Sequence, residues 1–339
     1  QERIRFMDIL FDQSSTVDLI LSYRLAIIGY GNQAKAQAKN LRDSGLQVTI
    51  GLRHNSESWQ SAVDDGFIVK DMISAVENSN FIMMLVPDDV QPTLFDQIKH
   101  RIQQGTILAF AHGFCIHYQL IKPTSELSVV LIAPKGPGKS VRSWYLDGKG
   151  VPALIAIHQV AKNTKDDPLS VALSYAKAIG STRAGVFHTT FKDETETDLF
   201  GEQAVICGGL TELIKAGFET LIESGYPEEI AFFECLYEVK MIADHVFSNG
   251  LAAMHESVSL TAEFGSYING KRVIDSDTKT HMKTILQEIQ NGDFTQNMLD
   301  DMKHGQSQVL REGRQRLRDH PLEQTAKAVL SKISDVSQN

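Results

Sequence analysis

Short apolar runs alternate with amphipathic stretches through the first half of the chain. The runs consist mostly of Val, Ile, Leu and Met, and each is followed by Gly, Pro, Asn or a charged residue. This alternation is typical of buried parallel strands joined by crossover helices. The pattern predicts an open α/β sheet with strands at Leu25–Gly29, Gln47–Leu52, Phe81–Val86, Thr106–Ala109, Val129–Ala133 and Val151–Ile157.

From about Asp193 onward, long helical periodicities replace the strand pattern. One helix is expected from Asp198 to about Ser224, ending at Gly225, because glycine commonly follows the last turn of a helix. The next helix has Pro227 and two glutamates at its start and is expected to end at Asn249-Gly250. The second half of the chain is therefore predicted to be all-α.

The chain has 339 residues, 42% of them hydrophobic, which is enough for the cores of about two domains. We expect a nucleotide-binding α/β domain over residues 1–189 and a helical domain over residues 190–339. The net charge of −9 argues against nucleic acid or an anionic membrane as the main partner, since both favour a basic surface. A small molecule is the expected partner.

The three cysteines are widely spaced and match neither a zinc site nor a disulfide framework. They favour reduced thiols, so we expect a cytoplasmic protein. No apolar run approaches the ~20 residues that a membrane-spanning helix needs.

The segment RLAIIGYGNQAKAQAKNLRDSG is predicted to form a strand, a glycine turn and a helix. Gly29, Gly31 and Ala34 make a GxGxxA motif, in which the second glycine lets the backbone approach a pyrophosphate. The N-terminus of the following helix provides free N–H groups for the phosphates. A merely tight turn is the alternative; the motif favours a dinucleotide bound by Gly29, Tyr30, Gly31, Asn32 and Gln33.

The end of the second strand distinguishes between cofactors. An NAD enzyme usually carries an acidic residue there, whereas this strand ends in Gly-Leu-Arg53 and continues through Ser56 and Ser58. Guanidinium and hydroxyl groups can bind the 2′-phosphate of NADPH, which a carboxylate would repel. A solvated loop is the alternative, and Glu57 supports it; we favour NADPH.

Two pairs of acidic residues have i,i+4 spacing in the helical half: Asp198 with Glu202, and Glu234 with Glu238. Such pairs share a helix face and are common by chance, but both of these lie in apolar surroundings, where unpaired charges cost several kcal/mol each. Oxygen ligands without His or Cys favour Mg²⁺ or Mn²⁺, and four carboxylates suggest two ions. Buried salt bridges remain the alternative.

Six longer strings occur in order between about residue 20 and residue 320: GYGNQ, AHGFCIHY, IAPKGPG, TETDLFGEQAVICGG, AGFETLIESGYPEEIAFFECLYEVK and SVSLTAEFG. Together they resemble ketol-acid reductoisomerase, also called acetohydroxy acid isomeroreductase, in its short form. The resemblance implies a Rossmann domain that binds NADPH and a knotted helical domain that pairs with its copy in a homodimer or a higher homo-oligomer.

The resemblance also implies a reaction. Members rearrange 2-acetolactate or 2-aceto-2-hydroxybutyrate by migration of a methyl or ethyl group, and NADPH then reduces the product to a 2,3-dihydroxy-3-methyl acid on the route to branched-chain amino acids. Two Mg²⁺ ions would be held by Asp198 and Glu202 of one subunit and by Glu234 and Glu238 of its neighbour.

The remaining site residues come from the same resemblance. His112 and Lys135 match polar residues of the catalytic site, Ser259 matches the residue that binds the substrate carboxylate, and Gly138 belongs to the cofactor site. Glu234 or a ligated water is a candidate proton donor. Three of these residues also have ordinary structural alternatives: His112 as a core histidine, Lys135 as a solvated loop lysine and Ser259 as a helix cap.

Some positions depart from the family pattern, notably Ala34-Lys35-Ala36-Gln37, Cys115, Lys139, Leu260 and Ser266. Two other functions therefore stay open. One is a metal-independent, NADPH-linked hydroxy-acid or imine reductase, and the other is a catalytically silent NADPH-binding assembly protein.

Overall fold

The computed structural model describes residues 9–303 and 307–336. The chain divides into two compact units between Thr195 and Glu196, inside helix α9 (Phe191–Gly201). This division lies a few residues beyond the boundary expected at 189/190. Among the helices of the described residues, none combines the length and the apolar character needed to cross a bilayer.

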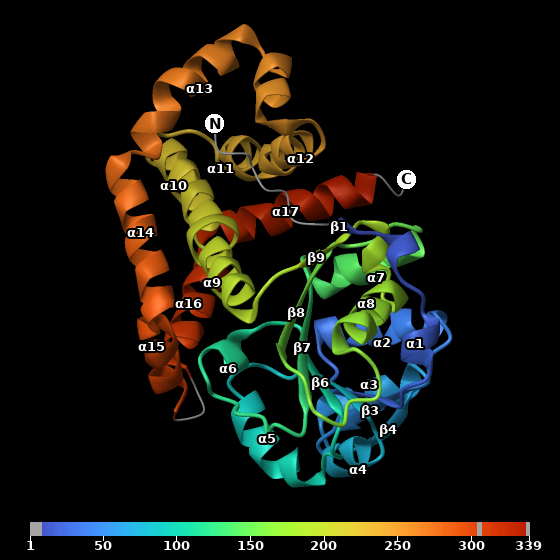
Figure 1. The fold of residues 1–339 in the computed structure, drawn as a ribbon. Coiled ribbons are helices and arrows are strands. Elements are labelled where there is room, and N and C mark those ends of the chain that lie inside the picture. The colour runs from blue at the N-terminus through green and yellow to red at the C-terminus, as the bar shows by residue number, and fades with distance from the viewer. Residues whose placement is uncertain (1–8, 304–306, 337–339) are drawn as a thin grey trace, which may run out of the picture. The chain divides into compact units, whose positions relative to one another are not determined.

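The first unit is built on a sheet that has nine strands within the described residues, in the order β1-β9-β8-β7-β6-β5-β2-β3-β4 (Figure 1). All six predicted strands are present. The sequence pattern did not predict three others, β1, β4 and β9, which are short or only partly buried. The strands are β1 (Ile9–Leu10), β2 (Leu25–Ile28), β3 (Val48–Leu52), β4 (Ile68–Asp71), β5 (Phe81–Met84), β6 (Ile107–Phe110), β7 (Ser128–Pro134), β8 (Ala153–Gln159) and β9 (Val186–His188).

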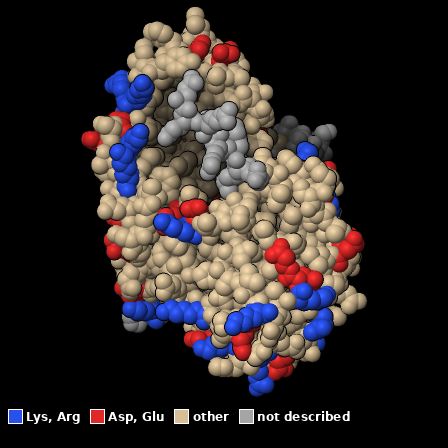
Figure 2. Space-filling model, in the orientation of Figure 1, with Lys and Arg blue, Asp and Glu red and all other residues tan. Residues whose placement is uncertain are grey.

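Helices cover both faces of this sheet, with α2, α7 and α8 on one face and α5 on the other (Figure 1). The α-helices of this unit are α1 (Asp18–Leu21), α2 (Asn32–Asp43), α3 (Glu57–Asp64), α4 (Met72–Glu77), α5 (Gln91–Ile98), α6 (Phe114–His117), α7 (Gly138–Leu146) and α8 (Pro168–Ala178). Short 3-10 turns lie at Asp12–Ser14, Lys99–Arg101 and Ser181–Arg183. On the face drawn in Figure 2, basic side chains lie beside acidic ones.

Strand β2 lies at the point where the strand order reverses. It pairs in parallel with β3 on one side and with β5 on the other, so that Leu25 is opposite both Val48 and Phe81. The chain leaves β2 and β5 in opposite directions, which opens a crevice at the carboxyl ends of these strands. All residues of β2 and β5 are buried, because the helices cover them from both faces.

The prediction that the strands are parallel was wrong for β8, which runs antiparallel to β7. After β7 the chain forms α7 and returns to β8 at the same edge of the sheet. There the Lys135 N–H donates to the Pro152 carbonyl at 2.8 Å. Glycines at 148 and 150 lie in the return loop. An apolar run signals a buried strand but not its direction.

The second unit is helical in its described part, as the periodicity predicts. Its helices are α10 (Gly209–Glu223), α11 (Glu228–Phe232), α12 (Glu238–Ser257), α13 (Leu260–Val273), α14 (Ser276–Asn291), α15 (Asp293–Met302), α16 (Gln308–Asp319) and α17 (Pro321–Val336). The helix end predicted at Gly225 is confirmed, since this glycine has φ +87° after α10. Gly250, the other predicted end, has φ +85° and forms a kink within α12, which continues to Ser257. The helix expected from Asp198 to Ser224 is divided among α9, a π-helical segment and α10. A core of Phe218, Phe232 and Leu322 joins α10, α11 and α17.

Two π-helical segments, Glu202–Ile206 and Phe233–Tyr237, interrupt the helices of this unit. The glycines that follow the first one have a steric reason. A Cβ on Gly208 would lie 2.0 Å from the Gln203 carbonyl oxygen, and one on Gly209 would lie 2.2 Å from that of Ala204. Only glycine fits against carbonyls that the wide turn presents in this way.

Candidate active site

The glycine turn lies at the carboxyl end of β2. Gly29 has φ +105°, and a Cβ there would meet the Leu85 carbonyl oxygen at 2.6 Å, so the turn packs backbone to backbone on the loop after β5. A Cβ on Gly31 would meet nothing within 4 Å. The turn therefore leaves open space beside Gly31 at the N-terminus of α2, as a bound pyrophosphate requires.

A second loop completes this surface. A Cβ on Gly138 would lie 2.3 Å from the Asn32 carbonyl oxygen, and the side-chain amide of Gln33 donates to the Gly136 carbonyl at 2.8 Å. The N-termini of α2 and α7 are thereby held side by side at one edge of the sheet. Neither helix has a side-chain cap hydrogen bond at its N-cap residue. Both helix dipoles therefore favour an anion there.

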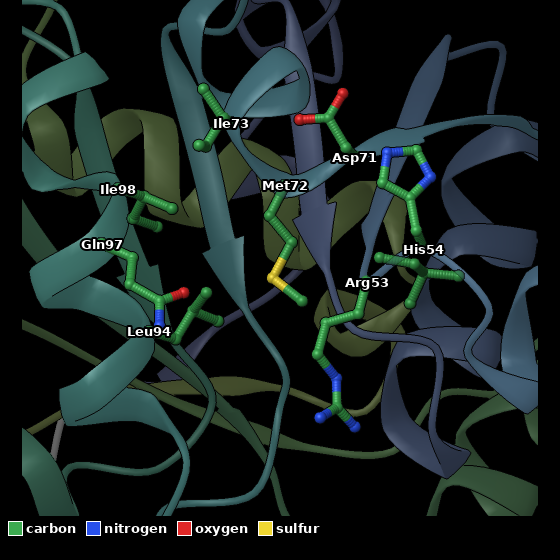
Figure 3. A pocket seen from close by; sticks show the side chains of 9 residues that line it. Arg53, His54, Asp71, Met72, Ile73, Leu94, Gln97 and Ile98 are labelled. Carbon is green, nitrogen blue, oxygen red and sulfur yellow. The ribbon is translucent and has the colours of Figure 1, made fainter.

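A pocket of about 300 Å³ lies between the ends of β3 and β4 and helix α5 (Figure 3). Its walls are largely apolar, and the Arg53 guanidinium points away from the Asp71 carboxylate. Ser56 is the N-cap residue of α3, yet its hydroxyl is buried and has no hydrogen-bond partner in the described structure. Ser58 lies in the first turn of α3. This arrangement fits an adenosine with a 2′-phosphate at the helix terminus.

His112 and Lys135 meet at a buried carboxylate that the sequence analysis did not single out. Glu194, in α9, is only 1% exposed; its oxygens lie 3.1 Å from His112 Nδ1 and 2.9 Å from Lys135 Nζ. The Gly113 N–H also donates to it, at 2.8 Å. His112 follows β6 and Lys135 follows β7, so the cluster lies at the sheet edge that carries the glycine turn.

Burial by itself raises the pKa of Glu194. The hydrogen bond with His112 and the charges of His112 and Lys135 outweigh that effect, so the pKa of Glu194 lies below its ordinary value. The carboxylate is therefore ionised at neutral pH and fixes the orientation of both partners. A fixed ammonium group at such an edge can stabilise negative charge that develops on an oxygen.

Three of the four predicted metal ligands lie in or next to the two π-helical segments, and Asp198 lies in α9. Glu202 begins the first segment, Glu234 lies in the second, and Glu238 follows it directly. Wide turns of this kind occur often at functional sites. Within residues 9–303 and 307–336, no three of the four carboxylates, including Asp198, offer oxygens within 4.8 Å of one another. Within the described residues of one chain, these four carboxylates therefore form no three-ligand metal site.

Ser259 is exposed and is the N-cap of α13, where its hydroxyl accepts from the Ala262 N–H at 3.2 Å. The structural alternative considered for Ser259, a helix cap, is therefore present. The hydroxyl lies at the surface in this arrangement. Tyr30 points into the protein, with its side chain buried, so any contact with a cofactor would come from its backbone.

Glu194 could have been found from its spacing. Glu194, Asp198 and Glu202 follow one another at intervals of four residues, so the acidic series is one member longer than the pair that we selected. Nothing local shows that this first member is buried, because its partners are 59 and 82 positions away along the chain.

Comparison with known proteins agrees with this geometry. Residues 19–185 match the family model described as acetohydroxy acid isomeroreductase, NADPH-binding domain, and residues 191–335 match ketol-acid reductoisomerase, C-terminal domain. The ketol-acid reductoisomerase (NADP(+)) of Corynebacterium jeikeium strain K411 is 49% identical over 320 residues, which is 94% of each chain.

Solved structures extend the match. An NADH-preferring ketol-acid reductoisomerase from an uncultured archean has a TM-score of 0.92 at 39% identity, over 96% of this chain and 99% of that one. A semialdehyde dehydrogenase NAD-binding protein from Cupriavidus necator has a TM-score of 0.60 at 17% identity, over 80% and 99%, and shows the fold alone. This chain belongs to the ketol-acid reductoisomerase family of branched-chain amino acid biosynthesis, and its matches to an NADPH-binding domain and to an NADP(+) enzyme make it an NADP-dependent member.

Proposed function

We propose that this chain converts 2-acetolactate and 2-aceto-2-hydroxybutyrate into 2,3-dihydroxy-3-methyl acids at the edge of the sheet that carries the glycine turn. The observation that carries this proposal is the buried Glu194 that binds both His112 and Lys135. His112 and Lys135 are two oriented donors at the carboxyl ends of β6 and β7. A dinucleotide bound at the glycine turn after β2 would bring its nicotinamide to this edge of the sheet, close to both donors.

The cofactor would lie across the crevice at the carboxyl ends of β2 and β5. The backbone of Gly29, Gly31 and Gly138 would accommodate the pyrophosphate, with Asn32 and Gln33 at the start of α2. Arg53, Ser56 and Ser58 would bind the 2′-phosphate; the unpartnered buried hydroxyl of Ser56 supports this assignment. NADPH bound there supplies the hydride for the reduction.

The four carboxylates Asp198, Glu202, Glu234 and Glu238 suit two Mg²⁺ ions, since they offer only hard oxygen donors. Bound Mg²⁺ would polarise the hydroxyl and carbonyl oxygens of the substrate and so promote alkyl migration. Lys135, held by Glu194, would stabilise negative charge on oxygen, and Ser259 would hold the substrate carboxylate. Glu234 is the proposed proton donor in the reduction.

We propose a homodimer, or a larger homo-oligomer built from it, in which each site takes one acidic pair from each subunit. Two observations support this assembly. Among the described residues of one chain, no three of the four carboxylates offer oxygens within 4.8 Å of one another. Helices α12 and α13 also expose large apolar side chains, with Phe247 82% and Leu260 81% exposed. Apolar surface of this kind usually marks an interface.

One further part of the proposal, the knotted path of the helical unit, rests on the family resemblance. A cytoplasmic location is proposed from the free thiols of Cys115, Cys207 and Cys235, which suit a reducing compartment.

The decisive assay follows NADPH oxidation with 2-acetolactate, with and without Mg²⁺, on the intact protein and on Glu234→Gln. We expect turnover that requires Mg²⁺ and falls sharply in the variant. Reduction of a simple keto acid that resists a chelator would favour the metal-independent reductase. Tight NADPH binding without turnover at any Mg²⁺ concentration would favour the silent assembly protein.

A further inference from the structure

Strand β2 has a buried tyrosine just beyond each of its ends. Tyr23 precedes the strand, and Tyr30 lies between the two glycines of the turn that follows it. Each phenol donates to a carboxylate, Tyr23 to Asp166 at 2.9 Å and Tyr30 to Asp65 at 2.8 Å. The two contacts are chemically alike, but only the second involves the proposed pyrophosphate turn.

The Tyr30 side chain is fixed on several sides. Its ring packs edge-on against Phe67, with centroids 5.8 Å apart, and Lys35 Nζ lies 5.5 Å from its centroid. Burial and the hydrogen bond to Asp65 raise the pKa of Tyr30 well above its ordinary value. The phenol therefore stays neutral and remains a hydrogen-bond donor throughout the physiological range.

Asp65 joins the glycine turn to two helices. Its carboxylate accepts from Tyr30 and pairs with Lys39 at 2.7 Å and with Lys35 at 3.6 Å, both on α2. Asp65 itself is the C-cap residue of α3. The Arg42 guanidinium donates to the Asp65 carbonyl oxygen and so adds a third contact from α2. One aspartate thus holds the turn, the pyrophosphate helix α2 and the helix α3 that begins at Ser56.

We propose that Asp65, acting through the Tyr30 hydroxyl, is a positioning residue for the cofactor pyrophosphate. The inference rests on the proposed placement of the pyrophosphate at Gly31. Tyr30 is flanked by the glycine that turns the chain and the glycine that would face the phosphates. Glycines provide no side chain that could hold this turn, so beside the backbone contacts of Gly29 the Tyr30 side chain helps to set the direction of the N–H groups.

The contact should matter for the pyrophosphate and not for the 2′-phosphate. Ser56 and Ser58 are at the opposite end of α3 from Asp65, and the C-cap at Asp65 is made by its backbone N–H, which Tyr30→Phe does not alter. Loss of a hydrogen bond to a charged acceptor is worth about tenfold in affinity when it is felt fully at the binding site. The expected signature is therefore selective for ligands that contain a pyrophosphate.

The experiment measures dissociation constants of the full chain for NADPH, ADP-ribose and adenosine 2′-monophosphate by calorimetry or competition. For Tyr30→Phe we expect binding of NADPH and ADP-ribose to weaken by about the same factor, roughly fivefold to tenfold, with adenosine 2′-monophosphate unchanged. Asp65→Ala should weaken the binding of both ligands at least as much as Tyr30→Phe, because it also removes the ion pairs with Lys39 and Lys35. Asp65→Asn keeps an acceptor for the phenol and should retain most of the affinity.

Tyr23→Phe is the matched control. Tyr23 is also buried, donates to a carboxylate, packs edge-on against an aromatic ring and has a lysine over its ring, namely Phe81 at 6.4 Å and Lys165 at 5.3 Å. Both variants should lower the melting temperature to a similar extent. Only Tyr30→Phe should change the affinity for ADP-ribose, because Tyr23 is at the opposite end of the strand.

Equal cofactor affinities in the two tyrosine variants would overturn the inference, as would equal weakening of ADP-ribose and adenosine 2′-monophosphate in Tyr30→Phe. Gly31→Ala tests the underlying site separately, since its added methyl meets no protein atom and projects into the space assigned to the phosphates. If Gly31→Ala weakens ADP-ribose and Tyr30→Phe does not, only the positioning role fails. If neither does, the pyrophosphate lies elsewhere and both proposals fail.

Discussion

Lys135 Nζ lies 2.9 Å from the Oε1 atom of Glu194, and this carboxylate is almost fully withdrawn from solvent. The Lys135 side chain is partly exposed, so the pair joins a buried carboxylate to a lysine that solvent can reach. An anchored carboxylate can thus orient a cation that faces substrate.

Glu194→Gln should lower kcat by about 10²-fold and leave the KM for NADPH within about twofold, because it loosens the orientation of Lys135 and His112 without touching the glycine turn. Steady-state kinetics with 2-acetolactate check this. Glu77→Gln is the control: its ion pair with Arg101 is solvent-exposed, so kcat should not change. An unchanged kcat in Glu194→Gln would mean that the cluster is only structural.

Gly138→Ala should raise the KM for NADPH severalfold and lower the free energy of unfolding by about 1–3 kcal/mol. The new methyl would meet the Asn32 carbonyl at 2.3 Å, and backbone cannot move aside as a flexible side chain can. Gly313→Ala, in α16, meets nothing within 4 Å and should be neutral or slightly stabilising. Urea unfolding and NADPH titration of both variants decide the matter; equal behaviour would contradict the packing argument.

Arg53→Gln should raise the KM for NADPH by about tenfold or more while leaving the KM for NADH nearly unchanged, because only NADPH carries the 2′-phosphate. The ratio of kcat/KM for the two cofactors is the measurement. Arg101→Gln changes charge equally, at a surface ion pair, and should leave that ratio unchanged. A parallel loss with both cofactors would place Arg53 elsewhere than at the 2′-phosphate.

Asp198→Asn and Glu234→Gln should each be inactive, yet co-expression of the two variants should restore activity. In a mixed dimer one site receives both altered residues and the other receives neither, so about a quarter of the wild-type activity is expected for random pairing. The purified mixture is assayed for NADPH oxidation with 2-acetolactate and Mg²⁺. No recovery, with mixed dimers shown to be present, would mean that each chain supplies its own complete site.

Asp65 should make stability depend on pH in the acid range. Burial raises its pKa, but the hydrogen bonds from Lys39 and Tyr30 and the charges of Lys39 and Lys35 outweigh this, so the pKa lies below its ordinary value. A carboxylate whose pKa is lower in the folded state than in the unfolded state stabilises the fold at pH values above the unfolded-state pKa. This contribution is lost as pH falls through the folded-state pKa.

The difference in free energy of unfolding between the wild type and Asp65→Asn should therefore be constant near neutrality. It should shrink toward zero as pH falls below the ordinary range of an aspartate. Urea titrations across the acid range measure it. A difference that stays constant into that range would show that the carboxylate charge contributes no stability.

The predictability of the fold follows from what local sequence encodes. Continuous apolar runs predict buried strands. Gly225 and Gly250 mark interruptions of helices, because glycine adopts the positive φ angles found there. The antiparallel direction of β8 is set by a return path through α7, which has no local signature. The half-exposed strand β4 has a mixed pattern that resembles a loop.

The candidate site likewise has one part that local sequence predicts and another part that it does not. The glycine turn could be predicted because its steric demands fall on consecutive residues. The spacing of Glu194 was a signal, but the roles of Glu194 and Asp65 could not be predicted, since they come from partners that folding brings together. These partners are Lys135 and His112 for Glu194, and Tyr30 and Lys39 for Asp65. An acidic residue that will be buried looks the same in sequence as one that will be solvated.

The π-helical segment at Phe233–Tyr237 makes the acidic pair Glu234 and Glu238 sensitive to deletion as well as to substitution. Removing one residue between them would restore ordinary helical spacing and rotate every later side chain in that helix by roughly 100°. The two carboxylates would then face different directions although neither had been replaced. Such a deletion would disrupt the proposed metal site as thoroughly as the loss of a ligand.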